Sequence, residues 1–278
     1  MNEVFQLVGV NVDWNFSFTF ATLIITRLAM VTSTIPFLVG KPVPGTIKLG
    51  FTVVMLVFLY PHLVPSDHSL LPKAPVMIFL LYLKEAFYGI SIGIAASIVF
   101  HAFEAAGAMV DNQRGAAQAR LLIPQLGEQT SIFGNFNFLL GIVIFLSIGG
   151  HLFFFKAVIE SYDLLPLLTL PKARPDFLAM TDEFIRTTGT VLVLALQLTA
   201  PVLIAIFVAD VVLGIMSKAA PAINVWELGF AIRGILGVLI YFLALGLIAT
   251  QMGKLSIGMI ETVERILRLL SLSPGYNI

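Results

Sequence analysis

The chain has 278 residues, of which 58% are hydrophobic and 12% are charged, and its 16 basic residues balance its 16 acidic ones. A soluble domain averages about 45–50% apolar and about 25% charged residues, and even a large globule still exposes roughly a quarter of the surface of its unfolded chain. The composition therefore predicts an integral membrane protein, or a protein that stays inside an apolar assembly, and it excludes a basic face for nucleic acid. Because the sequence contains no cysteine, disulfides, thiolate metal sites and cysteine nucleophiles are also excluded.

The N-terminal stretch, residues 1–15, carries Glu3 and Asp13 but no lysine or arginine. A cleaved signal peptide has a positively charged flank before its apolar segment. We therefore expect the first apolar run to be a retained span.

Six apolar runs follow, each near or above the roughly 20 residues that one helical crossing needs. They cover residues 16–39, 47–64, 76–103, 132–158, 190–216 and 230–250. The second is short, and the third and fourth exceed one straight crossing, so we predict an all-α fold with about six to eight long apolar helices. The rule that positive loops stay inside gives no orientation, because the two sets of loops hold seven and five lysine or arginine residues.

Beyond the last run, residues 256–270 show a helical periodicity. The stretch places five apolar side chains on one face, namely Ile257, Ile260, Val263, Ile266 and Leu267. We predict that this face lies on a membrane surface or packs on a partner, and an exposed terminal helix is the alternative.

Charged residues interrupt the apolar runs at Arg27, Lys84, Glu85, Asp210 and Arg233. Each would cost roughly 2.5–3.5 kcal/mol at a lipid-facing helix centre, so these side chains should face protein or water. One interpretation is an ion or proton path. The other, which we favour, is pairing between helices or subunits. Asp210 has two candidate partners, Arg233 and Arg27, which the sequence does not rank.

Two short patterns imitate reactive sites. Residues 89–93 match the G-x-S-x-G elbow of serine hydrolases, but that elbow needs a strand, a turn and a helix, and here it lies inside an apolar helix. Gly89 and Gly93 are better explained as a small-residue packing face. His62 and His68, which flank Asp67, do not have the spacing of a helical ligand pair, and no nucleotide-binding motif is present. The sequence thus indicates no metal, no cofactor and no enzyme.

The segment between the two longest runs, residues 105–130, is small, polar and punctuated by glycine. Non-helical backbone is tolerated at membrane depth only where protein buries it or where it lines a water-filled cavity. From composition alone, a pore-lining loop and an ordinary surface loop are equal alternatives. Later in the chain, Pro201 interrupts the fifth run, Pro221 ends it, and Asn224 is placed to cap the next helix.

Two motifs resemble the FliR/SctT family, the flagellar R-type and injectisome T-type subunits of the type III secretion export gate. One lies in residues 209–230 and comprises Asp210, Gly214, Ser217-Lys218, Pro221, Asn224-Val225-Trp226 and Gly229. The other is Gly107-x-x-x-Asp111-x-Gln113-Arg114-Gly115, followed by Gly127-Glu128-Gln129 and Gly149-Gly150-His151. The likeness covers most of the chain, to about residue 253, and the second motif is more similar to injectisome members.

The resemblance implies a non-enzymatic gating subunit in the bacterial inner membrane, within the basal body of a secretion system. It would assemble with P-type and Q-type subunits into a helical export gate, joined by V-type and U-type subunits, through which unfolded secreted proteins pass. Residues 1–170 would resemble a P-type subunit and residues 180–278 a Q-type helical hairpin. In such assemblies the helices stand in a ring largely above the bilayer.

The resemblance also implies roles for particular residues. Residues 107–127 would form the plug that closes the channel, with Gly107, Gly115 and Gly127 allowing tight folding. Four residues would pair with neighbouring subunits in the closed state, namely Gln113, Arg114, Gln118 and Arg120. The alternative class is a stand-alone secondary transporter, which predicts an inverted repeat that the two dissimilar halves do not show.

Overall fold

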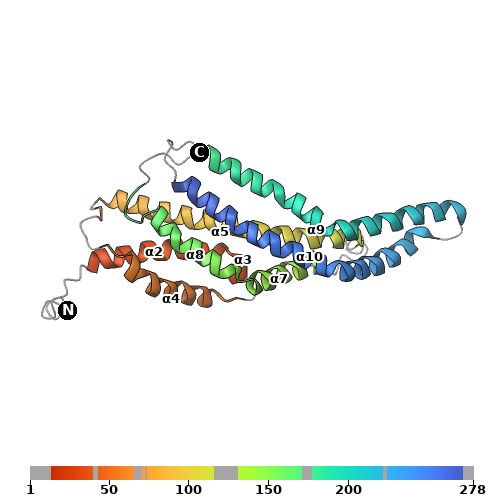
Figure 1. Ribbon diagram of the computed structural model, residues 1–278, viewed down its shortest axis with the longest axis horizontal. Coiled ribbons are helices and arrows are strands. Elements are labelled where there is room, and N and C mark those ends of the chain that lie inside the picture. Colours follow the sequence, from red (N-terminus) through yellow and green to blue (C-terminus); the bar gives the residue numbers. More distant parts are fainter. Residues whose placement is uncertain are drawn as a thin grey trace. The chain divides into compact units, whose positions relative to one another are not determined.

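The computed structural model describes residues 14–39, 43–65, 71–72, 74–115, 131–170, 177–221 and 224–271. Within these residues every regular element is a helix (Figure 1): α2 (Trp14–Thr34), α3 (Pro36–Val39), α4 (Gly45–Leu63), α5 (Pro75–Gln113), α7 (Ile132–Ser147), α8 (Gly150–Leu164), α9 (Phe177–Ala219) and α10 (Val225–Ser271). Five of them, α2, α4, α5, α9 and α10, are long and apolar enough to cross a membrane, and the bent pair α7–α8 makes a sixth if it counts as one span. The prediction of an all-α integral membrane protein is confirmed.

Two of the expected runs are divided in the structure. The first breaks at Ile35, because Pro36 lacks a backbone N–H and disfavours helical geometry in the residue before it. The fourth, expected as one span, is bent by 76° between α7 and α8. Gly149 at the bend has a φ of 74°, which glycine adopts without steric cost. A side chain on the next residue, Gly150, would overlap the ring of Phe145.

Three helices are much longer than the runs that predicted them. α5, α9 and α10 have 39, 43 and 47 residues, which at 1.5 Å per residue gives about 60–70 Å, roughly twice the hydrocarbon core of a bilayer. α9 and α10 follow one another as a hairpin through residues 220–224 (Figure 1). The predicted cap on α10 is confirmed, because the backbone N–H of Glu227 donates to Asn224 Oδ1 at 3.4 Å.

The stretch 256–270 is the end of α10 and differs from its prediction. Val263, Ile266 and Leu267 are buried, whereas Ile257 is 54% exposed. Arg265 Nη1 also donates to Glu183 Oε1 at 3.2 Å. The C-terminal part of this face, Val263, Ile266 and Leu267, therefore packs within the chain and not on a membrane surface or a partner.

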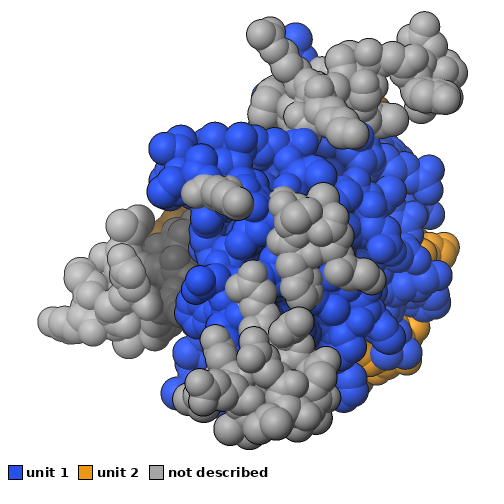
Figure 2. All heavy atoms as spheres, turned by 90° about the vertical axis from the view of Figure 1, so that its left-hand side faces the viewer, with its two compact units in different colours: residues 1–97, 152–184, 260–278 blue, residues 98–151, 185–259 orange. Residues whose placement is uncertain are grey.

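The chain divides into two compact units (Figure 2). Unit 1 comprises residues 1–97, 152–184 and 260–278, and unit 2 comprises residues 98–151 and 185–259. Each unit combines segments from both halves of the sequence, and α5, α9 and α10 contribute to both. The P-type-like and Q-type-like parts are assigned from their resemblance to other subunits, which a division into compact units does not test. They therefore stay a prediction.

Close helix packing in unit 1 explains the apparent hydrolase elbow. A Cβ atom on Gly89 would lie 2.6 Å from the carbonyl oxygen of Arg27, and one on Gly93 would overlap the side chain of Thr34. The hydroxyl of Ser91 donates to the carbonyl of Phe87 in its own helix at 2.8 Å. The small residues thus let α5 approach α2, as the packing interpretation predicted.

Candidate functional site

The predicted plug begins as helix, not as a loop. Residues 107–113 are the last turns of α5, and a side chain on Gly107 would overlap the backbone of Phe133, so this glycine serves close packing. The helix ends because Gly115 has a φ of 94° and its N–H donates to the Asn112 carbonyl at 3.1 Å. A glycine in this conformation is a common helix terminator. Arg114 and Gly115 therefore form a turn after the helix.

Asp111 joins the end of α5 to the start of α7. Its side chain is buried, and its Oδ2 accepts hydrogen bonds from Ser131 Oγ at 2.6 Å and from the backbone N–H of Phe133 at 2.9 Å. Ser131 is the N-cap of α7 and accepts in turn from the N–H of Gly134 at 2.9 Å. A carboxylate here satisfies N–H groups that lack helical partners and interacts favourably with the helix dipole.

Arg114 and two aromatic rings extend this junction. Arg114 Nη1 lies 3.4 Å from Asp111 Oδ1, and its guanidinium lies 4.7 Å from the centre of the Phe133 ring. Phe133 makes an edge contact with Tyr241 at 4.5 Å between ring centres. The hydroxyl of Tyr241 donates to Asn137 Oδ1. We call Asp111, Arg114, Ser131, Phe133 and Tyr241 the junction cluster, and all of it lies in unit 2.

The predicted plug residues lie in different environments, and some lie outside the described residues. Asp111 and Arg114 come together in the junction cluster, Gly107 and Gly115 shape its backbone, and Gln113 is exposed on the last turn of α5. Gln118, Arg120 and Gly127 lie outside the described residues. Sequence reasoning missed Asn137 and Tyr241, although a buried amide and a phenol within apolar runs were a signal that they find a partner.

A second charged cluster is buried in unit 1 around Arg27. Arg27 Nε donates to Glu85 Oε2 at 2.6 Å, and neither side chain is exposed. Arg27 Nη1 donates to the carbonyl and the hydroxyl of Ser161 at 2.9 and 3.1 Å, and Nη2 donates to the carbonyl of Leu165 at 2.8 Å. The guanidinium also lies 4.2 Å from the centre of the Tyr162 ring. The charge is therefore fully paired and hydrogen-bonded, as a buried charge must be.

Lys84 reaches the same end of α8. Its ammonium donates to the carbonyls of Pro166, Leu167 and Thr169 at 2.7, 3.0 and 3.0 Å, which uses its three protons. Its contact with Glu85 Oε1 at 2.9 Å is thus one of charge. The C-terminus of a helix carries partial negative charge and unpaired carbonyls. Arg27 binds carbonyls at this end of α8, and Lys84 binds three carbonyls of the turn that follows it, so the cluster fixes how the chain leaves α8.

Asp210 and Arg233 pair across the α9–α10 hairpin. Arg233 Nε donates to Asp210 Oδ1 at 2.6 Å, with 29% and 37% of the respective side chains exposed. Of the two partners that the sequence allowed, Arg233 is therefore the one present. Arg27 is bound instead to Glu85. These are pairings between helices of one chain, as the favoured interpretation proposed.

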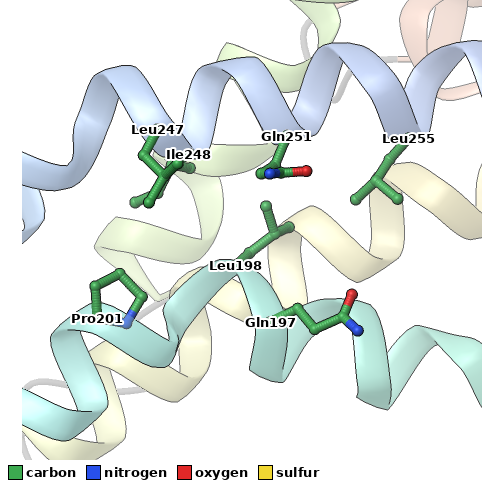
Figure 3. Close-up of a pocket in the computed structure, with 7 residues that line it drawn as sticks. All are labelled: Gln197, Leu198, Pro201, Leu247, Ile248, Gln251 and Leu255. Atoms are coloured by element: carbon green, nitrogen blue, oxygen red, sulfur yellow. The ribbon is translucent and has the colours of Figure 1, made fainter.

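The same hairpin leaves a groove of about 280 Å³ between its helices (Figure 3). Its lining is Gln197, Leu198 and Pro201 of α9 with Leu247, Ile248, Gln251 and Leu255 of α10. Leu198 and Gln251 lie between the two helices, and Pro201 cannot donate to the carbonyl four residues before it. None of the lining side chains is titratable, so the groove offers no acid–base chemistry.

Metal-binding groups do not gather in the described part of the chain. No three histidine or carboxylate side chains there lie close enough to hold an ion. Asp67 and His68 of the histidine-containing loop lie outside the described residues.

Long apolar helices, glycine-mediated packing and internally paired charges define a multi-pass helical membrane protein. Residues 18–258 match a family described as bacterial export proteins, family 1. The chain is 34% identical over 219 residues to the Yop proteins translocation protein T of Yersinia pestis, which covers 79% of this chain and 83% of that protein. It is 25% identical over 262 residues to the flagellar biosynthetic protein FliR of Bacillus subtilis, covering 90% and 95%.

A third relative is the surface presentation of antigens protein SpaR of Salmonella typhimurium, 27% identical over 224 residues, with 80% and 81% covered. The chain belongs to the bacterial export protein family, and the resemblance to the FliR/SctT family is confirmed. Its higher identity to the Yop translocation protein T than to FliR agrees with the predicted likeness to injectisome members. Family membership makes the chain a component of a bacterial export apparatus.

Proposed function

We propose that this chain is a structural and gating subunit of the type III secretion export apparatus. With P-type and Q-type subunits it forms the entry channel for secreted proteins in the bacterial inner membrane, within the basal body. V-type and U-type subunits join this assembly, and unfolded substrate chains pass along its axis. The subunit catalyses no reaction. Residues 1–170 act as the P-type-like part and residues 180–278 as the Q-type-like hairpin.

The observation that carries the gating role is the double attachment made by Asp111. Its carboxylate binds Ser131 and Phe133 at the start of α7, while its own backbone lies in the last turn of α5. The described residues on either side of residues 116–130 are therefore held together by this carboxylate. We call residues 116–130 the gate segment. A segment anchored at both ends can obstruct a channel without being carried along by a passing substrate.

The charged side chains have separate roles in this proposal. Gln118 and Arg120 of the gate segment, with Gln113 and Arg114 before it, hold the closed state by pairing within the assembly. Arg27 with Glu85, and Asp210 with Arg233, fix helix packing. Their pairing within the chain supports a packing role over a proton path, because every charge already has an opposite charge within 2.6 Å.

Native mass spectrometry of detergent-extracted protein tests the assembly. The chain is expressed with and without its P-type and Q-type neighbours, and the proposal expects one defined hetero-oligomer that contains this chain only when both are present. A stable homo-oligomer that forms regardless of those neighbours would contradict it and favour the stand-alone transporter.

A further inference from the structure

We propose that the groove between α9 and α10 is the docking site for a helix of another export-apparatus subunit, which inserts a carboxamide side chain between Gln197 and Gln251. This inference rests on the proposed assembly with other subunits and deepens it, because it names the surface and the chemistry of one contact. All residues that carry it lie in unit 2.

The two glutamines are exposed amides in an apolar hairpin (Figure 3). Gln197 lies on the α9 side of the groove, and Gln251 of α10 lies between the two helices. Among the described residues neither amide has a hydrogen-bond partner. One turn before each glutamine the exposed side chain is apolar, Val193 in α9 and Leu247 in α10. Because an unpaired amide in apolar surroundings is costly, a glutamine on each wall indicates a polar occupant.

The backbone of α9 adds an acceptor at the same place. Pro201 has no N–H, so the carbonyl of Gln197, four residues before it, does not receive the hydrogen bond that a helix normally supplies. The groove has a volume of about 280 Å³, slightly below the range of roughly 300–1,000 Å³ that is typical of small-molecule sites. It therefore suits one inserted side chain better than a separate ligand.

Beside the groove, α10 has no side chain at Gly246. This position is exposed, and a Cβ atom there would have no atom of the described chain within 4 Å. In contrast, Gly237 of the same helix leaves room for Arg114. Glycine weakens a helix relative to alanine, and no contact within the described chain compensates for it at Gly246. A glycine here does allow another helix to come close, as small residues do between membrane helices.

The polar atoms of the groove favour one class of occupant. A lipid chain has no hydrogen-bonding atoms and would leave both amides and the Gln197 carbonyl unpaired. An ionised acid only accepts hydrogen bonds and a lysine only donates them, whereas a carboxamide has two N–H donors and a carbonyl acceptor. An asparagine or glutamine on a partner helix can therefore bond both to the Gln197 carbonyl and to the glutamine amides.

Competition for limiting partners tests the docking site. Wild-type chain and a tagged variant are expressed together with P-type and Q-type subunits, and native mass spectrometry gives the ratio of the two versions in the hetero-oligomer. One hydrogen bond between membrane helices changes affinity about three- to twentyfold. Gln197→Leu with Gln251→Leu should therefore lower the ratio at least about threefold. Thr190→Val is the control, because its hydroxyl is exposed but bonded within α9, and it should leave the ratio at one.

The thermal unfolding midpoint separates docking from damage to the hairpin. It should not fall in the purified double variant, because neither amide has a partner within the described chain. Equal incorporation of the double variant and the wild type, or a midpoint that falls together with incorporation, would overturn the docking site alone. If the wild-type chain forms no hetero-oligomer at all, the proposed function is overturned and this inference with it.

Photocrosslinking in the assembled complex identifies the occupant. Phe242 is 71% exposed and lies one turn before Gly246 on α10, so Phe242→p-benzoylphenylalanine is a small change beside the groove. We expect an adduct with a different subunit, in a peptide that contains asparagine or glutamine, and less of it when Gln197→Leu and Gln251→Leu are added. An adduct with a second copy of this chain, or with lipid alone, would overturn the proposal.

Discussion

Arg27 and Glu85 form a salt bridge of 2.6 Å with neither side chain exposed to solvent. The pair is one part of a larger arrangement in which Arg27 binds backbone carbonyls at the end of α8 and Lys84 binds those of the segment that follows. Arg27 donates hydrogen bonds to Glu85, Ser161 and Leu165, and its side chain is not exposed to solvent. It therefore does not line a water-filled path. The cluster thus joins α2, α5 and α8 in unit 1, and it supports a role in packing.

Removing the Glu85 carboxylate from this cluster should strongly destabilise the protein. Glu85→Gln leaves Arg27 and Lys84 buried together without their counter-charge, and breaking a buried ion pair typically costs about 3–5 kcal/mol. We expect a large fall in the thermal unfolding midpoint of the purified protein and little assembled complex. Glu160→Gln is the control, because its pair with Lys156 spans 3.6 Å and is mostly exposed, so its effect should stay below about 0.5 kcal/mol. Equal stability of the two variants would contradict the account.

The junction made by Asp111 should be visible in hydrogen exchange. Asp111→Ala leaves the N–H of Phe133 and the hydroxyl of Ser131 without an acceptor, a loss worth about 1–3 kcal/mol for buried groups. The first turn of α7 should therefore exchange faster, whereas the middle of α7 should be unaffected. Asn112→Ala, at an exposed neighbouring position, should leave the pattern as it is. Unaltered protection in Asp111→Ala would mean that α7 does not depend on this carboxylate.

The packing of α5 on α2 gives a third test. Gly93→Ala introduces a methyl group that overlaps Thr34, and overpacking of this kind costs about 1–3 kcal/mol. Gly50→Ala in α4 meets nothing within 4 Å, and alanine is the better helix former by about 1 kcal/mol. Unfolding measurements should therefore move in opposite directions. A tolerated Gly93→Ala would refute the close approach of the two helices.

Asp210 and Arg233 should behave as a packing pair in the hairpin. Asp210→Asn removes the opposite charge from Arg233, so we expect less assembled complex and a proportional loss of export. Exchanging the two residues, Asp210→Arg with Arg233→Asp, should restore part of both, and each quantity is measured in the same cells. If Asp210→Asn assembles normally and yet abolishes proton-driven export, the residue belongs to a proton path and the packing role is wrong.

The helical fold was predictable because apolar runs and their proline and glycine breaks are local features. The runs underestimated α5, α9 and α10, since the outer turns of these helices carry polar residues, as at Asp111 and Gln113. The bend at Gly149 lies inside one continuous apolar run, so hydrophobicity alone gave no sign of it.

The site was predictable only in part, because its contacts join residues far apart in the chain. Composition and likeness singled out Asp111 and Arg114, but their partners depend on how α5, α7 and α10 pack. Tyr241 and Asn137 are separated by 104 positions. Arg27 and Lys84 bind backbone carbonyls, which have no signature in a sequence. To predict the pairing of Asp210 with Arg233, one would have to know the register of the two helices in the hairpin, which is a property of the folded protein.

The gating claim is tested most directly by the ion conductance of the closed complex in a planar bilayer. Deleting residues 116–123 shortens the gate segment and spares Asp111, Arg114 and Ser131, so the anchors at both ends remain. With assembly verified by native mass spectrometry, the account predicts that the deletion raises the small-ion conductance well above that of the intact complex. A deletion complex that assembles normally and stays as tight as the intact one would contradict the gate.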